Sequence, residues 1–319
     1  MTTPDNKPKK IGLALGSGGA RGWAHVGVLH RLHELGLTPH CVAGTSIGSI
    51  IGALYASNSL NTMEALATHL DWRQVAQLFL EVNFPRSGLL SGKNFMHLLK
   101  QIIPCHAISE LTIPYAAVAT DLATEKEVVL QSGNLFDAIR ASIAIPGIFT
   151  PARLNGRTLV DGGLVNPLPV SVCRAMGADL VIAVDVNLRA STVRRKTPKA
   201  PAPVQPSRHV TKLLATVGHL MPQLTTPVEE AVSRWLTPPK RREAEAPSIF
   251  DVLTRSFRLV ENQITRRELA INPPDLLIQP AVGDLMTLEF HRGTEAISAG
   301  ACAVDEVLPQ LRALLGLNP

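Results

Sequence analysis

The sequence predicts a layered α/β fold with parallel strands, because short apolar runs alternate with glycine-rich turns and helical patterns. The first run, Ile11–Leu15, enters the turn Gly16-Ser-Gly-Gly19, and apolar residues then recur at helical spacing from Trp23 to Leu32. The second run, Cys41–Gly44, passes through another tight turn into a helix of small residues over Ile50–Ala56. Two successive strand–turn–helix units place their strands side by side in one sheet.

Further strands and helices follow in the same style. Short apolar runs predict strands over residues 115–120, 127–130, 158–160 and 180–186, and the patterns between them predict helices over residues 136–142 and 169–176. No change of composition interrupts this series, so residues 9–188 are expected to form one core.

Composition limits the class of protein. Hydrophobic residues make up 45% and charged residues 18% of the 319 residues, which is enough to bury a sizeable core. Aromatic residues are only 4%, which argues against a protein that stacks single-stranded bases, and no nucleic-acid partner is expected. No transmembrane run or secretory signal is expected, and the four cysteines contain no C-x-x-C pair. These features predict a cytoplasmic protein with reduced thiols.

Residues 189–248 differ from the core. No Asp or Glu lies between Val186 and Val228, whereas Lys and Arg are frequent and proline is common, which predicts a basic linker. Apolar spacing within 209–224 predicts an amphipathic helix. Residues 189–224 are a candidate peripheral contact with an anionic membrane at the inner face, and the alternative is a solvated linker followed by a helix that packs on the core.

The C-terminal part, residues 249–319, is expected to complete the same domain. Ser248-Ile-Phe-Asp251 resembles a capping box, and an apolar stripe continues from it as a helix. A strand is predicted over Leu276–Ile278, and one last helix over residues 294–315.

The motif Gly44-Thr-Ser46-Ile-Gly48 is the strongest local signal for chemistry. A serine between a strand and a helix needs a sharp turn, and small flanking residues let the backbone pass while Oγ stays accessible. The helix that follows also favours negative charge near this serine. By itself the motif is equally compatible with a tight turn lined by glycines.

The segment Gly16-Ser-Gly-Gly-Ala-Arg-Gly22 is a second signal. Its glycines let backbone N–H groups converge on an anion, as an oxyanion hole requires. A Walker loop needs a lysine that is absent here, and a dinucleotide site needs an acidic residue at the end of the next strand, where Gly44-Thr-Ser46 stands instead. Nucleotide binding is therefore the weaker interpretation.

Asp161, followed by Gly162 and Gly163, is the third signal. An aspartate at a strand end, before two glycines, is fixed by a turn and open to another loop, although an Asx turn alone explains the pattern too. The histidines show no H-E-x-x-H, and His25 and His30 are expected at the surface or the edge of the core. No metal site and no cofactor are predicted.

Together, these three motifs resemble the patatin-like phospholipase family, in their order and spacing. Ala141–Phe149 and Asn166-Pro-Leu-Pro169 are similar to that family as well. The likeness is greatest to bacterial members of the neuropathy-target-esterase branch. It covers residues 9–188, and residues 251–290 resemble the C-terminal part of those proteins.

The resemblance implies a three-layer α/β/α fold with a mostly parallel central sheet, and a lipid or ester substrate. Ser46 matches the nucleophile and Asp161 its base, which gives a dyad without histidine in an acyl hydrolase of the phospholipase A, lysophospholipase or esterase type. The oxyanion loop corresponds to Gly18, Gly19 and Ala20. Supporting positions correspond to Gly16, Arg21, Gly22, Gly44, Gly48, Gly162 and Gly163.

Two other functions stay open on the sequence. A histidine-dependent α/β-hydrolase would keep Ser46 and take its base from His209, His219 or His291. A non-catalytic regulatory or binding protein would use the same fold without turnover, because a fold does not fix a function. If Asp161 is the base, partial burial is expected to raise its pKa above the ordinary value near 4.

Overall fold

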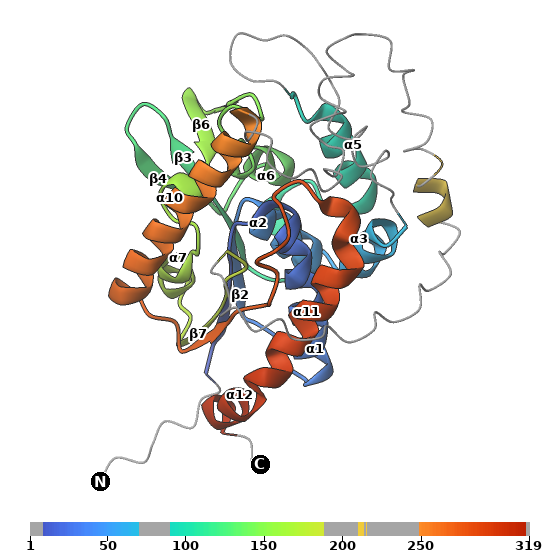
Figure 1. The fold of residues 1–319 in the computed structure, drawn as a ribbon, viewed down its shortest axis with the longest axis vertical. Coiled ribbons are helices and arrows are strands. Elements are labelled where there is room, and N and C mark those ends of the chain that lie inside the picture. Colours follow the sequence, from blue (N-terminus) through green and yellow to red (C-terminus); the bar gives the residue numbers. More distant parts are fainter. Residues whose placement is uncertain (1–8, 70–89, 188–209, 214, 216–248, 317–319) are drawn as a thin grey trace, which may run out of the picture.

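The computed structural model describes residues 9–69, 90–187, 210–213, 215 and 249–316. These residues form a mixed, mostly parallel sheet between two layers of helices (Figure 1). The predicted three-layer α/β/α class is confirmed. The strands are β1 (Ile11–Leu15), β2 (Cys41–Thr45), β3 (Tyr115–Asp121), β4 (Lys126–Leu130), β5 (Ala152–Leu154), β6 (Arg157–Asp161), β7 (Leu180–Val184) and β8 (Leu276–Ile278).

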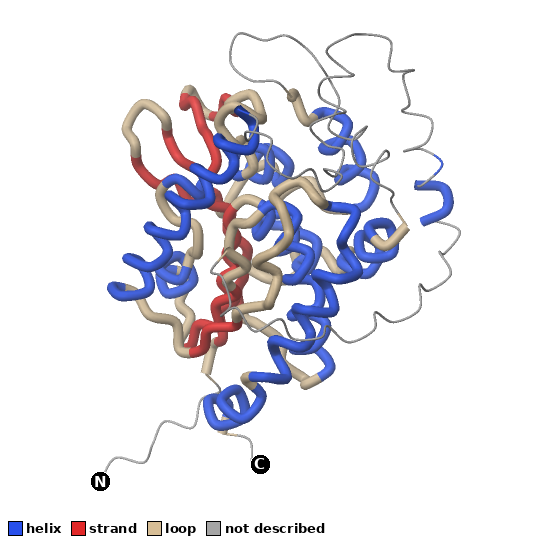
Figure 2. Tube along the Cα trace, in the orientation of Figure 1, coloured by secondary structure: helices blue, strands red, loops and turns tan. Residues whose placement is uncertain are grey.

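Helices cover both faces of this sheet, whose strands run through the middle of the molecule (Figure 2). The described α-helices include α1 (Trp23–Glu34), α2 (Ile47–Ala56), α3 (Leu60–Ala67), α5 (Lys93–Ile102), α6 (Leu135–Ser142), α7 (Val170–Ala175), α10 (Ile249–Ile271), α11 (Gly293–Glu306) and α12 (Leu308–Leu315).

Strand order follows β5-β6-β3-β2-β1-β7-β8, and β4 also pairs with β3. The pairs from β3 through β2, β1 and β7 to β8 are parallel, whereas β4 and β6 lie antiparallel to β3. The carboxyl ends of the parallel strands therefore meet at one edge, which is where α/β folds place their sites.

The period of two along each strand explains why both faces are covered. In β1, Leu13 and Leu15 join the larger apolar core with α1 and α2, and Ala14 joins a smaller core with α7. Every residue of β1 is buried. Such continuous apolar strands are typical of a parallel sheet with helices on both sides.

Residues far apart in the chain complete this domain. β8 extends the sheet by pairing with β7, and α11 packs along α1. The predicted strand Leu276–Ile278 is confirmed at both ends. The other strands and helices predicted in residues 115–186 are present, with ends that shift by two residues at most.

The prediction of one last helix over residues 294–315 is wrong. The structure has two helices, because α11 ends at Glu306 and α12 starts at Leu308. Pro309 lies in the first turn of α12, where its missing N–H costs nothing, whereas inside a longer helix it would break a hydrogen bond.

Most of the predicted basic linker and amphipathic helix, residues 189–248, lies outside the described residues. Only residues 210–213 and 215 are described, and they are helical, with Val210 and Leu213 buried and Thr211 and Lys212 exposed. Membrane contact through residues 189–224 stays a prediction. Within the described part, no helix has both the length and the apolar character of a transmembrane span.

Candidate active site

Ser46 lies at the sharp turn between β2 and α2. Its backbone has φ 55° and ψ −122°, a conformation that non-glycine residues rarely adopt. A Cβ on Gly44 would overlap the backbone of Gly48, and a Cβ on Gly48 would overlap the carbonyl of Leu15. The two glycines of the motif are therefore required by close packing of backbone around the serine.

Asp161 meets Ser46 because of the register of the sheet. Thr45 pairs with Val118 of β3, and Asp161 pairs with the next residue of that strand, Ala119. The ends of β2 and β6 are thus neighbours across β3. The Ser46 Oγ donates a hydrogen bond of 2.6 Å to Oδ2 of Asp161.

Burial sets the acidity of Asp161, whose side chain is fully enclosed. Loss of solvation raises its pKa from 3.8 to about 7, against the hydrogen bonds from Ser46 and from the N–H of Gly163, which favour the ionised form. The Gly163 N–H lies 2.8 Å from Oδ1. A carboxylate of this basicity is matched to proton transfer near neutral pH.

Ser142, at the end of α6, holds the Ser46 turn from the other side. Its Oγ accepts the Ser46 N–H at 2.9 Å and donates to the carbonyl of Val118 at 2.6 Å. This residue was missed as a site residue, although it lies in the segment Ala141–Phe149 that resembles the patatin-like family.

The glycine loop follows β1 and reaches the same edge of the sheet. Gly18 and Gly19 line a pocket together with Ser46. The N–H of Ala20 already donates to the carbonyl of Thr287 at 2.8 Å. The Ala20 N–H is therefore already bonded in this structure, so Gly18 and Gly19 are the better candidates, and the oxyanion hole stays a prediction.

Arg21 is buried behind the glycine loop and fixes it. Its guanidinium donates to Oδ1 of Asn187, at 3.2 and 2.8 Å, and to the carbonyl of Leu285 at 3.0 Å. Burial, followed by the nearby Arg258 charge, lowers its pKa to about 10. The Asn187 side chain in turn donates to the carbonyl and hydroxyl of Ser17.

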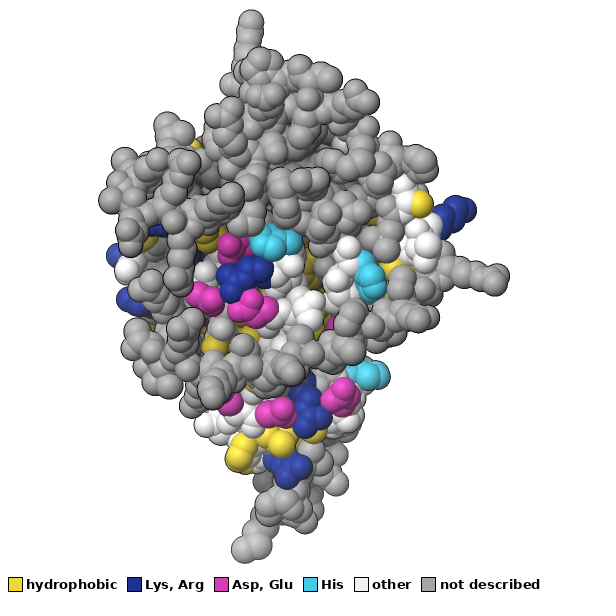
Figure 3. Space-filling model, turned by 45° about the vertical axis from the view of Figure 1, so that its right-hand side comes forward, with side chains coloured by type: hydrophobic (Ala, Val, Ile, Leu, Met, Phe, Trp, Pro, Cys, Tyr) yellow, Lys and Arg dark blue, Asp and Glu magenta, His cyan; other side chains and the backbone are white. Residues whose placement is uncertain are grey.

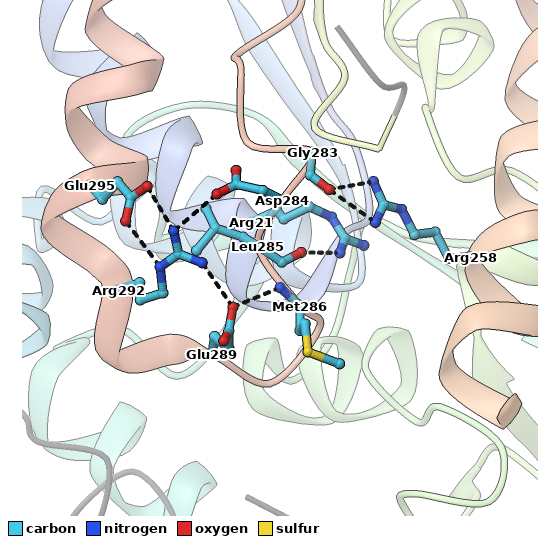
Figure 4. A network of polar contacts seen from close by, with 9 residues as sticks. All are labelled: Arg21, Arg258, Gly283, Asp284, Leu285, Met286, Glu289, Arg292 and Glu295. Carbon is cyan, nitrogen blue, oxygen red and sulfur yellow. Dashed lines mark hydrogen bonds and ion pairs between the residues drawn. The ribbon is translucent and has the colours of Figure 1, made fainter. Parts of the chain in front are cut away.

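Three arginines hold the segment 283–289 over the glycine loop (Figure 4). Arg21 donates to Leu285, Arg258 donates to the carbonyl of Gly283 at 3.4 Å, and Arg292 bridges three carboxylates. The three carboxylates belong to Asp284, Glu289 and Glu295. The arrangement fixes Thr287 against Gly19, where any Cβ on the glycine would collide with Thr287.

On the face drawn in Figure 3, acidic and basic side chains of the described part are mixed rather than separated by sign. This distribution agrees with the network around Arg292, in which one guanidinium is shared by neighbouring carboxylates.

Helix α10 forms one wall of the Ser46 pocket. Four residues of this helix line the pocket together with Ile145 and Ile148; they are Thr254, Phe257, Arg258 and Glu261. None of the four α10 residues was predicted as a site residue, although residues 251–290 resemble the C-terminal part of the family. They reach the site only because a helix late in the chain lies across the carboxyl edge of the sheet.

The remaining glycines of the motifs have structural roles. Gly16 donates to the carbonyl of Val184 at 3.0 Å, and Gly22 leaves room for the Ile47 side chain. Gly162 lies against the carbonyl of Val118. Each keeps two segments of the site in close contact.

Histidine does not contact Ser46 in the described residues. The Ser46 hydroxyl donates its hydrogen bond to Asp161, and His291 lies outside the pocket that Ser46 lines. His209 and His219 are outside the described residues.

His25 is fully buried, contrary to the expectation that it lies at the surface or the edge of the core. Its Nε2 lies 2.8 Å from the Gly16 carbonyl oxygen, and burial lowers the pKa of His25 to about 4. Within the described ranges, no three side chains converge as a metal site would need.

The segments that form this site also match a known protein family. The Patatin-like phospholipase family model matches residues 13–174, which include the glycine loop, the Ser46 turn and Asp161. The chain belongs to the patatin-like phospholipase family. An "Uncharacterized NTE family protein" of Mycobacterium tuberculosis is 35% identical over 329 residues, covering 94% of this chain and 91% of that protein.

Other patatin-like relatives are much longer. Human "Patatin-like phospholipase domain-containing protein 6" is 37% identical over 187 residues, which cover 57% of this chain and 14% of that protein. Among solved structures, VipD from Legionella pneumophila aligns with a TM-score of 0.44 and 12% identity, over 94% of this chain and 67% of that one. Membership of a phospholipase family supports a lipid hydrolase.

Proposed function

We propose that this patatin-like protein is a serine acyl hydrolase that cleaves lipid esters with a Ser46–Asp161 dyad. The observation that carries the proposal is the 2.6 Å hydrogen bond from the Ser46 hydroxyl to a fully buried carboxylate. A serine hydroxyl becomes a nucleophile when a positioned base accepts its proton during attack. The raised pKa of Asp161, about 7, makes this carboxylate a better base than an exposed aspartate.

The acylation step follows from these contacts. Ser46 Oγ attacks the ester carbonyl carbon while its proton passes to Oδ2 of Asp161. The carbonyl oxygen becomes an oxyanion near the N–H groups of Gly18 and Gly19. When the intermediate collapses, the bond to the alcohol oxygen breaks, and this oxygen takes the proton from Asp161.

The deacylation step uses the same groups. Asp161, again ionised, accepts a proton from a water molecule that attacks the acyl carbon. Collapse of the second intermediate breaks the bond to Ser46 Oγ, which recovers its proton from Asp161. The products are a carboxylic acid and the free enzyme, so a single carboxylate serves as base and acid in both halves.

The pocket supports an ester with an apolar acyl chain. Ile145, Ile148 and Phe257 offer apolar surface beside Ser46, and Arg258 adds a positive charge that suits a phosphate-bearing alcohol. Phospholipids and lysophospholipids combine both properties. Hydrolysis of a phospholipid, a lysophospholipid and a p-nitrophenyl ester, compared under the same conditions, ranks these substrate classes.

Labelling with a fluorophosphonate probe tests the proposed nucleophile. The wild-type protein should be labelled, and Ser46→Ala should lose both labelling and ester hydrolysis. Ser132→Ala is the matched control, because Ser132 is exposed and far from β2 in the sequence. An unlabelled, properly folded wild type would instead favour a non-catalytic binding protein on this fold.

A further inference from the structure

Glu261 is a second buried carboxyl beside the dyad, and the mechanism above does not use it. Among the described residues it is the only buried glutamate, with 4% of its surface exposed. It lies on the inner face of α10 and lines the pocket with Ser46, Gly18 and Gly19. Acidic side chains are rarely buried unless they are paired or protonated.

The Glu261 carboxyl contacts both catalytic loops. One oxygen, Oε1, lies so close to Gly163 that a Cβ there would collide with it, and the same Cβ would be 3.1 Å from Oδ1 of Asp161. The other side of the carboxyl faces the glycine loop, through a hydrogen bond with Ser17 and a 3.4 Å contact with Nδ2 of Asn187. Glu261 therefore spans the turn that carries the base and the loop that carries the oxyanion donors.

We propose that Glu261 is a positioning residue that acts as a neutral carboxyl, joining the Asp161 turn to the glycine loop, and that its ionisation reduces catalysis. The inference rests on the proposed serine hydrolase function. It adds a dependence on a residue outside the three motifs, in helix α10.

Electrostatics gives the reason for the neutral form. Burial, followed by the negative charge of Asp161, raises the pKa of Glu261 to about 8. The other charged groups that face it are Arg21 behind the glycine loop, Asp185 after β7 and Arg258 on α10. Arg21 lowers this pKa and Asp185 raises it.

The order of titration defines a working range. Both carboxyls have raised pKa values, about 7 for Asp161 and about 8 for Glu261, and the negative charge on Asp161 opposes the ionisation of Glu261. At a pH between these two values, the pair of carboxyls carries one negative charge and one proton. The two ionisation steps belong to the coupled pair of carboxyls. Above this range a second negative charge lies beside the place where the oxyanion forms, and like charges at short range oppose its formation.

The test is a pH–rate profile for hydrolysis of a soluble p-nitrophenyl ester. For the wild type, kcat should fall about fivefold between pH 8 and pH 9, because one titrating group with a pKa of about 8 controls the alkaline limb. Glu261→Gln carries a neutral amide at every pH and should lose this limb. Its acid limb, set by Asp161, should remain.

Two substitutions of Glu261 distinguish a role of its hydrogen bonds in positioning the site from a role of its side-chain volume alone. Glu261→Ala should lower kcat at pH 7.5 by about tenfold or more, with a smaller change in KM, and Glu261→Gln should restore most of that loss. Glu268→Gln is the matched control on the same helix, because Glu268 lies outside the pocket and accepts a bond from Asn272. Its profile should match that of the wild type.

Several outcomes would overturn the proposal. They are a wild-type profile without an alkaline fall, a Glu261→Gln profile that keeps the fall, or equal loss in the Gln and Ala variants. The wild-type profile decides the question even where a variant does not fold. If the wild type neither reacts with a fluorophosphonate nor turns over ester, the serine hydrolase proposal itself fails, and that result is separate from all three.

Discussion

At the scale of single residues, two energetically unfavourable features lie beside the Ser46 hydroxyl. Ser46 has a positive φ, and Asp161 is enclosed without solvent. Each such feature costs free energy and persists only where neighbours enforce it. Ser142 is one of these neighbours, because it accepts the Ser46 N–H and anchors itself to Val118.

We expect Ser142→Ala to weaken both stability and reactivity. The substitution leaves a buried Ser46 N–H and a Val118 carbonyl without this partner, a loss of about 1–3 kcal/mol in the free energy of unfolding. The Ser46 turn should also relax, so fluorophosphonate labelling should be slower. Urea unfolding and labelling kinetics measure the two effects.

Ser57→Ala is the control for this prediction. Ser57 is also buried and bonds to the backbone carbonyl of Leu54, away from the pocket. It should lower stability without slowing the labelling of Ser46. Equal labelling rates in Ser142→Ala and wild type would contradict the assigned role of Ser142.

At the scale of elements, α1 and α11 cross at unusually close range. A Cβ on Gly27 would overlap the carbonyl oxygen of Ile297, and one on Gly300 would overlap that of Ala24. These two helices therefore touch backbone to backbone, which links the helix after the glycine loop to the C-terminal part of the chain.

We predict that Gly300→Ala destabilises the protein by about 1–3 kcal/mol, because the added methyl group forces two tightly packed helices apart. Thermal or denaturant unfolding measures the loss. Ser298→Thr also adds a methyl group to α11, at a half-exposed position, and should cost less. Similar losses for both variants would show that the crossing tolerates extra volume.

The sequence predicts those elements whose signal is local. Continuous apolar runs predicted β1, β2 and β8, and glycines around a serine and an aspartate pointed to the Ser46 and Asp161 turns. The prediction of one last helix was wrong at Pro309. This proline lies in the first turn of a second helix, α12, because a proline inside a longer helix would break it.

The rest of the site is not local in sequence. Ser142, Thr287 and Glu261 enter through tertiary contacts. They lie in segments that resemble the family, but no chemical motif in those segments singles them out as site residues. For Ala20, the structure adds a contact that the sequence did not predict. Its place in the glycine loop suggested a donor, but a carbonyl from segment 283–289 already occupies its N–H.

At the scale of the whole molecule, the buried carboxyls set how stability depends on pH. Asp161 and Glu261 both have raised pKa values in the folded state, about 7 and about 8, so the folded protein binds protons more tightly than the unfolded chain. Their stabilising contribution is complete below the unfolded values near 4 and is lost as the pH rises through the folded values.

We therefore predict that the wild type becomes less stable from pH 5 to pH 9, and that Asp161→Asn is more stable than wild type at pH 8. Each unit of pKa shift corresponds to about 1.4 kcal/mol, so the gain should be measurable. Tm across this pH range provides the test. Asp137→Asn, at an exposed position of α6, is the control and should follow the wild type. A parallel pH dependence in Asp161→Asn and wild type would contradict the prediction.

The position of α10 and segment 283–289 at the sheet edge also bears on the order in which the site is assembled. A chain is synthesised from its N-terminus, so Ser46 and Asp161 leave the ribosome well before Glu261 and Thr287. During that interval the nucleophile has its base but lacks one wall of its pocket and the carbonyl that fixes the glycine loop. We therefore expect the proposed Ser46–Asp161 dyad to gain its complete pocket only after the C-terminal part of the chain has folded.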